Sequence, residues 1–392
     1  MAITEKGNGG PAGGSSTTHV PVVGPSLLQP HGPPVPDVHR IAVLRANSIG
    51  DFVLALPALA ALRAAYPAAR ISYLGEPWHP RLLDGRPGPW DEIVVVPPYP
   101  GVRGGSEDLR NGPEVSAFLT RQRCQRYDLA VQLHGGGANS NPFVTALGAR
   151  VTVGARSTDA PPLDRWLPYT ETQHEILRCL EVVGLAGAPP VELEPQLTPT
   201  AEDAAAAEAV LPTGAEPLVA VHPGAHDPRR RWAPERFGAV ADALARRGAT
   251  VVLVGNGTDD ERAAAAVAAA MTVEPLDVVG RLSLVALAGI LRRCRLLVGN
   301  DSGPRHLAEA LGTATVGIFL ERNLVNAGPL TRRRHRVAVS SRTACPVCGR
   351  DENRSRCPHD PSFVDDVGVE QVLAEAVDLL TATGSDDAGP LG

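Results

Sequence analysis

The chain has 392 residues, a length that predicts two domains, and a formal net charge of −6. This negative charge argues against a protein that coats nucleic acid or an anionic membrane surface. No apolar run reaches the roughly 18 residues that a membrane-spanning helix needs. No basic segment followed by an apolar one opens the chain either. We therefore expect no integral membrane segment and a cytoplasmic protein.

Composition predicts where the folded part begins and ends. Residues 1–38 are rich in Gly, Pro, Ser and Thr with almost no periodic apolar pattern, which predicts a disordered leader. A second disordered segment, the tail, is expected at 381–392. Between them, a stretch rich in Pro and Gly at 184–217 is the expected hinge region, with a short helix at 201–210. We place the two domains at 39–195 and 196–380.

The first domain alternates short apolar runs with amphipathic segments. Because β-strands joined through helices form parallel sheets, this alternation predicts a parallel sheet with helices on both faces. Pro57 is expected to kink the first helix or to delay its regular part. The expected strands are 41–45, 71–74, 93–96, 129–133 and 150–153, and the expected helices are 51–66, 114–126, 140–148 and 173–184.

The second domain repeats the same alternation. The expected strands are 218–222, 250–254, 277–279, 296–298 and 315–319, and the expected helices are 234–247, 259–270, 283–292 and 304–311. Gly312 stands where the C-terminal cap of the last of these helices belongs. The predicted fold class is therefore α/β, with two Rossmann-like, doubly wound domains facing a cleft.

A polar turn at 299–306 separates a strand from a short helix in the second domain. Asp301 or Ser302 suits the N-cap of this helix, and Pro304 suits its first turn. In an α/β domain the turn lies at the carboxyl end of a parallel strand, where free helix amides and the positive dipole end attract phosphate. The turn predicts either helix caps alone or a site for an anionic ligand.

Two other loops follow predicted strands in the same way. Asp51 comes soon after the first strand, where its carboxylate is either the N-cap of the next helix or a general base on a bound hydroxyl. His222 and Gly224 begin the loop after the strand at 218–222, and Arg229–Arg231 follow them. These arginines are either a solvated run or partners for a diphosphate.

Four segments resemble, in this order, the family 9 glycosyltransferases that lipopolysaccharide heptosyltransferases typify. They are Arg45–Pro57, with Ile-Gly-Asp before Leu-Pro-Ala-Leu, then Val221–Phe237, Val254–Gly257 and Gly299–His306. The resemblance covers about residues 40–380. No single motif decides it, but four motifs in the right order and domain placement make it specific.

The resemblance implies a GT-B fold and inverting, metal-independent transfer of a sugar such as heptose from a nucleotide-diphosphosugar, for example ADP-heptose. The acceptor, a small molecule or glycan, would bind the N-terminal domain, with Asp51 as base and Ser48 and Gly50 beside it. Arg231 would contact donor phosphates, and Asp301 would face the sugar hydroxyls. The implied donor side consists of His222, Gly224, Arg231, Asp301, Ser302, Gly303 and His306. The sequence has no Asp-x-Asp pair of the kind that holds a divalent cation against a diphosphate, and no cofactor is expected.

The chain departs from the family in the segment Leu133–Asn141. Many members carry a more basic acceptor-side loop where this chain has His134 and three glycines. Glycines at such a place predict close approach of the backbone to a ligand, so His134 and Gly135 are candidate acceptor contacts. A hydrolase oxyanion hole is set aside, because the chain has no Gly-x-Ser-x-Gly elbow.

A cysteine-rich loop lies near the C-terminus, and such a loop in this region also resembles other family members. Cys345, Cys348 and Cys357 are followed by His359, and three thiols with an imidazole can hold zinc. Reduced loop cysteines are the alternative.

Two rival functions remain beside the transferase. A nucleotide-sugar epimerase would convert the donor without any acceptor, and a non-catalytic sugar-nucleotide binding module would bind it without turnover. A dehydrogenase that uses NAD is disfavoured, because 46–50 lacks the three-glycine fingerprint.

Overall fold

The computed structural model describes residues 32–212, 214, 217–351, 357–359 and 361–383. Its N-terminal half contains a six-stranded parallel sheet in the order β3-β2-β1-β4-β5-β6. This order reverses between β1 and β4, as in Rossmann-type sheets. The strands are β1 (Arg40–Leu44), β2 (Arg70–Gly75), β3 (Glu92–Val95), β4 (Leu129–Gln132), β5 (Val151–Arg156) and β6 (Arg165–Pro168).

Helices cover both faces of this sheet because its central strands are apolar on both sides. The helices are α1 (Ile49–Ala65), α2 (Trp78–Leu83), α3 (Pro113–Arg123), α4 (Ser140–Ala146) and α5 (Glu175–Gly184), with a short 3-10 helix at Glu107–Asn111. Helices α1 and α5 share one apolar cluster with the sheet, and α3 and α4 share another on the opposite face. Pro57 lies inside α1, which runs without a break, so the expected delay of this helix is wrong.

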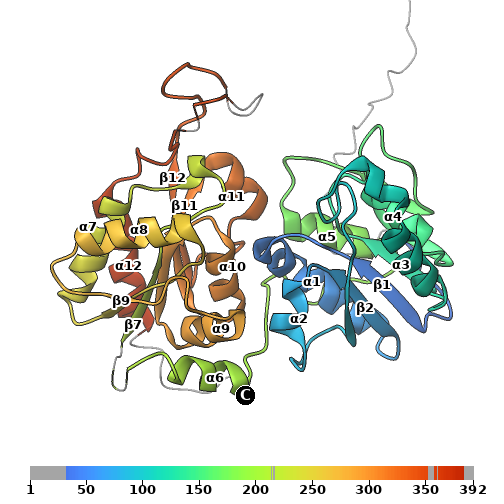
Figure 1. The fold of residues 1–392 in the computed structure, drawn as a ribbon, viewed down its shortest axis with the longest axis horizontal. Helices are drawn as coiled ribbons and strands as arrows, with labels where there is room; N and C mark the ends of the chain where they lie inside the picture. Colours follow the sequence, from blue (N-terminus) through green and yellow to red (C-terminus); the bar gives the residue numbers. More distant parts are fainter. Residues whose placement is uncertain (1–31, 213, 215–216, 352–356, 360, 384–392) are drawn as a thin grey trace, which may run out of the picture.

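The C-terminal half has a second six-stranded parallel sheet, in the order β12-β11-β10-β7-β8-β9. The order reverses between β7 and β10, and the predicted pair of Rossmann-like domains is confirmed (Figure 1). The strands are β7 (Leu218–His222), β8 (Thr250–Leu253), β9 (Leu276–Asp277), β10 (Leu296–Asn300), β11 (Ala314–Leu320) and β12 (His335–Ser340).

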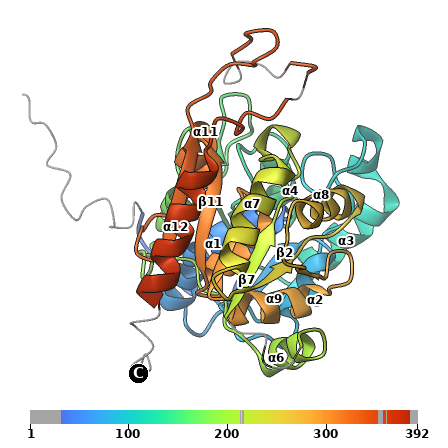
Figure 2. The same ribbon diagram turned by 90° about the vertical axis from the view of Figure 1, so that its left-hand side faces the viewer.

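The second sheet is also covered on both faces. Figure 2 looks onto the outer face, where α7, α8 and α12 stand in front of the strands. Helices α9 and α10 lie on the face that meets the N-terminal domain, and α6 packs on α9. The bounds are α6 (Ala201–Glu208), α7 (Pro234–Ala245), α8 (Thr258–Ala269), α9 (Leu284–Arg293), α10 (Gly303–Ala310), α11 (Glu321–Ala327) and α12 (Val369–Thr383), with a 3-10 helix at Pro228–Arg230.

At both described ends of the chain, the folded part extends further than the sequence predicted. Residues 32–38, assigned to the leader, pack on the N-terminal domain. Val35 is buried, and its backbone N–H donates to the Tyr66 hydroxyl at 3.0 Å. One apolar side chain and several backbone contacts therefore fix a segment that composition alone assigns to the leader. Helix α12 extends to Thr383, past the expected start of the tail at 381. The rest of both segments, 1–31 and 384–392, lies outside the described residues.

The two domains are joined by apolar packing and by one buried ion pair. Residues of α1 and of α9 and α10 belong to the same apolar cluster. Arg86, after α2, forms hydrogen bonds of 2.7 and 2.6 Å to the two carboxylate oxygens of Asp203 in α6. Both side chains are 2% exposed. This packing holds α1 against α10 and so determines which residues of the two domains face each other at their boundary.

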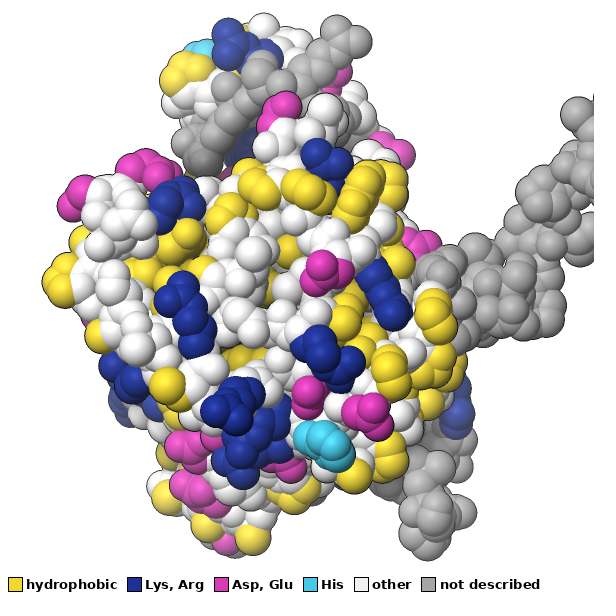
Figure 3. Space-filling view, turned by 90° about the vertical axis from the view of Figure 1, so that its right-hand side faces the viewer, with side chains coloured by type: hydrophobic (Ala, Val, Ile, Leu, Met, Phe, Trp, Pro, Cys, Tyr) yellow, Lys and Arg dark blue, Asp and Glu magenta, His cyan; other side chains and the backbone are white. Residues whose placement is uncertain are grey.

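The surface of the N-terminal domain carries charges of both signs (Figure 3). On the outer face of the N-terminal domain, basic side chains are interspersed with acidic ones (Figure 3). Elsewhere in the domain, Arg63 pairs with Asp91, and Arg70 pairs with Glu92. Within the described part of the chain, no helix combines the length and the apolar character needed to cross a bilayer.

Candidate active site

The candidate residues lie after the strands that flank the reversal point of each sheet. In the N-terminal domain, Asp51 follows β1 and His134 follows β4. In the C-terminal domain, His222 ends β7 and Asp301 follows β10. Ligands of open α/β sheets bind at the carboxyl ends of strands at such points. The sheet order therefore places one group of candidate residues in each domain at the position where a ligand is expected.

Asp51 lies at the third position of α1. The hydroxyl of Ser48, the N-cap residue, donates to Asp51 Oδ2 at 2.7 Å, and the two residues form a reciprocal capping box. The alternative that Asp51 is itself the N-cap is wrong, because α1 begins two residues earlier than expected. Its other carboxylate oxygen pairs with Arg45 at 2.8 Å, and its side chain is 34% exposed. Asp51 is thus held from two sides and still reaches solvent.

A buried charge network lies beneath Asp51. Arg45, 2% exposed, also pairs with Glu175 Oε1 at 2.7 Å, and Glu175 pairs with Arg178 as well. Burial raises the pKa of Asp51, but Arg45 and the hydrogen bonds from Ser48 outweigh it, so this pKa lies below its ordinary value. The carboxylate is therefore ionised at neutral pH.

His134 and Gly135 lie beside this network. The backbone N–H of Ala46 donates to His134 Nδ1 at 3.2 Å. Burial, followed by the charge of Arg45, lowers the pKa of His134 to about 4, so its imidazole is neutral at pH 7. Gly135 has φ of +67°, a conformation that side chains disfavour, and a Cβ added there meets nothing within 4 Å. The loop therefore leaves open space over Gly135.

Asp301 is buried at the centre of a second polar cluster. Its Oδ2 accepts hydrogen bonds from Arg230 at 3.0 Å and Asn323 at 2.9 Å, and its Oδ1 lies 3.2 Å from His306 Nε2. Burial raises the pKa of Asp301, but His306 and the arginines hold it well below its usual range. Asp301 thus fixes the side chains around the turn.

The first turn of α10 receives no side-chain cap. Ser302 occupies the N-cap position, but its hydroxyl donates to the Asn300 carbonyl at 3.0 Å instead of accepting from the helix. The same hydroxyl lies 2.9 Å from His222 Nδ1, and His222 Nε2 lies 3.3 Å from Asp260. Ser302 is thus the N-cap residue of α10, as one of the two expected alternatives had it, but its side chain makes no capping hydrogen bond. The free N–H groups of this turn remain available to an anion.

The N-termini of α1 and α10 meet at the domain boundary. A Cβ added to Gly50 would come within 2.9 Å of His306 Cδ2, and one added to Gly303 within 3.3 Å of Ile49 Cβ. Burial and then Arg305 lower the pKa of His306, so its ring is neutral at pH 7. The first turn of α1, which carries Asp51, is thus in contact with His306 of the other domain.

This close contact predicts that Gly50→Ala destabilises the protein. The added methyl group would press on the His306 ring, which the Asp301 cluster holds in place, and overpacking of this kind costs about 1–3 kcal/mol. Urea denaturation measures the loss. Gly368→Ala is the matched control, since its Cβ would meet nothing closer than Glu370 at 3.8 Å. Equal unfolding free energies for the two variants would contradict the contact.

Arg231 and Gly224 border an open hollow of about 440 Å³ on the C-terminal domain. Arg231 donates to the Ala225 carbonyl at 2.8 Å and to Asp259 at 2.9 Å, and it remains 35% exposed. Gly224 lies directly against Asp260, where a Cβ would come within 1.8 Å of a carboxylate oxygen. The hollow combines apolar side chains such as Trp232 and Pro234 with charged ones such as Arg231 and Arg262.

Sequence reasoning missed several contacts of these clusters. Arg45 and Glu175 support Asp51, and Arg230, expected only as a possible partner for a diphosphate, pairs with Asp301. A charged residue directly after an apolar strand, as at Arg45, was an available signal of a buried ion pair. Glu175 and Arg230 carried no such signal, because their partners lie 130 and 71 positions away.

Fold and site together define an α/β protein with two Rossmann-like domains whose candidate residues meet at the domain boundary. A model of glycosyltransferase family 9 (heptosyltransferase) matches residues 116–357, more than half of the chain. The chain belongs to glycosyltransferase family 9 and is a glycosyltransferase, as the four motifs implied.

Individual relatives support the same family and fold. Lipopolysaccharide heptosyltransferase 1 of Pseudomonas aeruginosa is 26% identical over 342 residues, which cover 83% of this chain and 89% of the relative. The crystal structure of a family 9 glycosyl transferase from Veillonella parvula has a TM-score of 0.71 at 23% identity, covering 88% of this chain and 97% of that one. ADP-heptose lipopolysaccharide heptosyltransferase II of E. coli has a TM-score of 0.69 at 20% identity, covering 88% and 99%. These likenesses support the GT-B fold.

Proposed function

We propose that this glycosyltransferase moves a sugar from a nucleotide diphosphate to an acceptor hydroxyl, with inversion and without a metal ion. Residues 39–195 bind a small-molecule or glycan acceptor, and 196–380 bind the donor. The observation that carries the proposal is the close approach of the first turn of α1, which carries Asp51, to the first turn of α10, which has no side-chain cap. ADP-heptose is the first donor to test, because the E. coli relative is named for it.

Asp51 is the general base of this proposal. As the acceptor oxygen attacks the anomeric carbon, its proton passes to a carboxylate oxygen of Asp51. The lowered pKa keeps that carboxylate ionised over the neutral range, and its 34% exposure lets a hydroxyl reach it. Arg45 and Ser48 orient the carboxylate, while His134 and Gly135 border the space in which the acceptor would lie.

The departing diphosphate leaves toward the C-terminal domain. When the bond between the anomeric carbon and the phosphate oxygen breaks, the electron pair stays on that oxygen and negative charge develops there. The free N–H groups of Gly303 and Arg305 at the start of α10 are the proposed partners of this charge. Arg231, in the loop that follows β7, adds a positive charge to the proposed donor site. These groups do the work that a divalent cation does in other transferases.

Binding of nucleotides tests the donor side. A ligand at about 100 times its dissociation constant, bound only to the folded state, adds about 2.7 kcal/mol of stability. We expect ADP to raise the melting temperature more than UDP, GDP or dTDP, with or without EDTA. An absent shift, or one abolished by EDTA, would contradict the metal-free nucleotide site.

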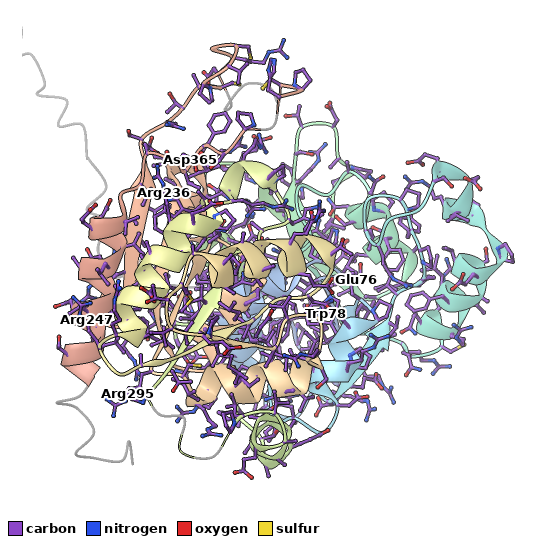
Figure 4. All side chains as sticks on the ribbon, turned by 60° about the vertical axis from the view of Figure 1, so that its left-hand side comes forward. Glu76, Trp78, Arg236, Arg247, Arg295 and Asp365 are labelled. Carbon is purple, nitrogen blue, oxygen red and sulfur yellow. The ribbon has the colours of Figure 1, made fainter. Side chains whose placement is uncertain are left out.

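Arg231→Met is expected to weaken ADP binding. Loss of a hydrogen bond to a charged group costs about 1.5–3 kcal/mol, or roughly 10- to 150-fold in the dissociation constant, which calorimetry measures. Arg247→Met serves as the control. Figure 4 shows Arg247 at the opposite end of α7, where its side chain donates to the Ala243 carbonyl at 2.7 Å. Equal affinities for both variants would remove Arg231 from the donor site.

A further inference from the structure

The segment between β12 and α12 forms a long loop that rises above the second sheet (Figures 1 and 2). It brings Cys345, Cys348, Cys357 and His359 together: one ligand atom from each lies within 4.8 Å of the others. We propose that these four residues bind one zinc ion in a tetrahedral site. The sequence left this choice open between zinc and reduced loop cysteines.

The turn around the first two cysteines is built to present their sulfur atoms on one side. Ala344 and Asp351 form an antiparallel bridge, and inside it the Cys345 N–H donates to the Arg350 carbonyl at 2.9 Å. The Gly349 N–H returns to the Cys345 carbonyl at 2.8 Å, and Gly349 has φ of +70°, which favours glycine. A tight turn of this kind fixes the two-residue spacing between Cys345 and Cys348.

Distances and donor chemistry both fit zinc. A tetrahedron with Zn–S bonds of about 2.3 Å has ligand atoms roughly 3.8 Å apart. Separations of up to 4.8 Å close to this value through small side-chain rotations. Three sulfurs and one imidazole nitrogen are a typical structural zinc set, and with four protein ligands the ion has no open position. The proposed ion is thus structural and takes no part in sugar transfer.

The loop has little apolar material with which to fold by itself. Its small buried cluster consists of Cys345, Cys357 and Phe363, packed against Leu320, while Val347 is 63% exposed. A short segment with so small a core needs a cross-link or a metal ion to hold one conformation. A zinc ion would supply this cross-link at the buried cysteines, Cys345 and Cys357.

Residues just after the metal ligands anchor the donor-side loop. The Ser362 hydroxyl donates to the Arg231 carbonyl at 2.7 Å, and the Phe363 N–H to the Arg229 carbonyl at 2.8 Å. Arg236 in α7 lies next to Asp365 and donates to its carbonyl at 2.6 Å (Figure 4). The zinc site thus stabilises the segment that contacts the donor-side loop. The importance of this contact for donor binding rests on the proposed function, whereas the zinc site itself does not.

Metal analysis of the isolated protein tests the site directly. We expect about one zinc per chain in the wild type and a loss of most of it in Cys357→Ser. Cys124→Ser is the matched control, because Cys124 is an exposed cysteine outside the cluster, and it should keep the zinc. Absence of zinc from the wild type would overturn the proposal, as would an equivalent of iron in its place.

Cobalt substitution in the wild-type protein gives a second test, which does not depend on whether a variant folds well. Wild-type protein stripped of metal and refilled with Co²⁺ should develop the visible absorption of tetrahedral cobalt with thiolate ligands. Cys348→Ser changes an exposed ligand, so we expect it to fold and to lose much of this absorption. A wild-type spectrum of octahedral cobalt, or one unchanged in Cys348→Ser, would contradict the site.

Discussion

Asp51→Asn is expected to lower kcat by about 10²- to 10⁴-fold, the usual contribution of general acid–base catalysis. Asparagine has nearly the same shape but cannot take the acceptor's proton. The proposed donor groups lie in the other domain, so the dissociation constant for ADP should stay nearly unchanged. Release of nucleoside diphosphate measures kcat, and calorimetry measures binding.

The matched control for this variant is Asp84→Asn. Asp84 is an exposed residue at the end of α2, and its replacement should leave both quantities unchanged. Retained turnover in Asp51→Asn would remove Asp51 as the base. A parallel loss of ADP affinity would indicate that the substitution disturbs the domain boundary instead.

Asp203→Ala is expected to lower the free energy of unfolding by about 3–5 kcal/mol, which is typical when one partner of a buried ion pair is removed. The change leaves Arg86, 2% exposed on its side chain, without its carboxylate partner between the two domains. It also removes the capping box of α6. Urea denaturation at pH 7 measures the loss. Glu107→Ala, which breaks an exposed pair with Arg110, should cost under about 1 kcal/mol.

The effect of Asp203 should depend on pH in a defined direction. Burial raises the pKa of Asp203, but hydrogen bonds from Arg86 and Thr200 lower it to a net value below the ordinary 3.8. A lowered pKa in the folded state stabilises the protein above the unfolded-state pKa and loses that effect as pH falls through the folded-state value. The gap between wild type and Asp203→Ala should therefore shrink below about pH 4. An unchanged gap would contradict the ion pair.

Most of the fold could be predicted because its signals are local. Apolar runs such as Leu218–His222 lie in fully buried central strands, and Gly312 adopts φ of +81° after α10, where a C-terminal glycine was expected. Elements without such signals were missed. They include β6, an edge strand with half-exposed side chains, and α2, a helix of six residues. The helices α11 and α12 and the strand β12 were not predicted either.

The candidate site was only partly predictable. Sequence position indicated Asp51 and the turn at Asp301 as candidates, because each comes soon after a buried strand. It did not reveal that Asp301 is enclosed by Arg230, Asn323 and His306, since the first two come from elements distant in the sequence, a 3-10 helix and α11. The predicted contact of Asp301 with sugar hydroxyls stays a prediction, as does the cleft between the domains. Both of its carboxylate oxygens already have protein partners.

Incubation with ADP-heptose alone, followed by NMR, tests the central claim most directly. Water can replace the acceptor in a slow side reaction, so we predict release of ADP together with heptose of inverted anomeric configuration at early times. The release should be insensitive to EDTA and lost in Asp51→Asn. Retained configuration, a requirement for a divalent cation, or an epimerised nucleotide sugar without ADP release would contradict the account.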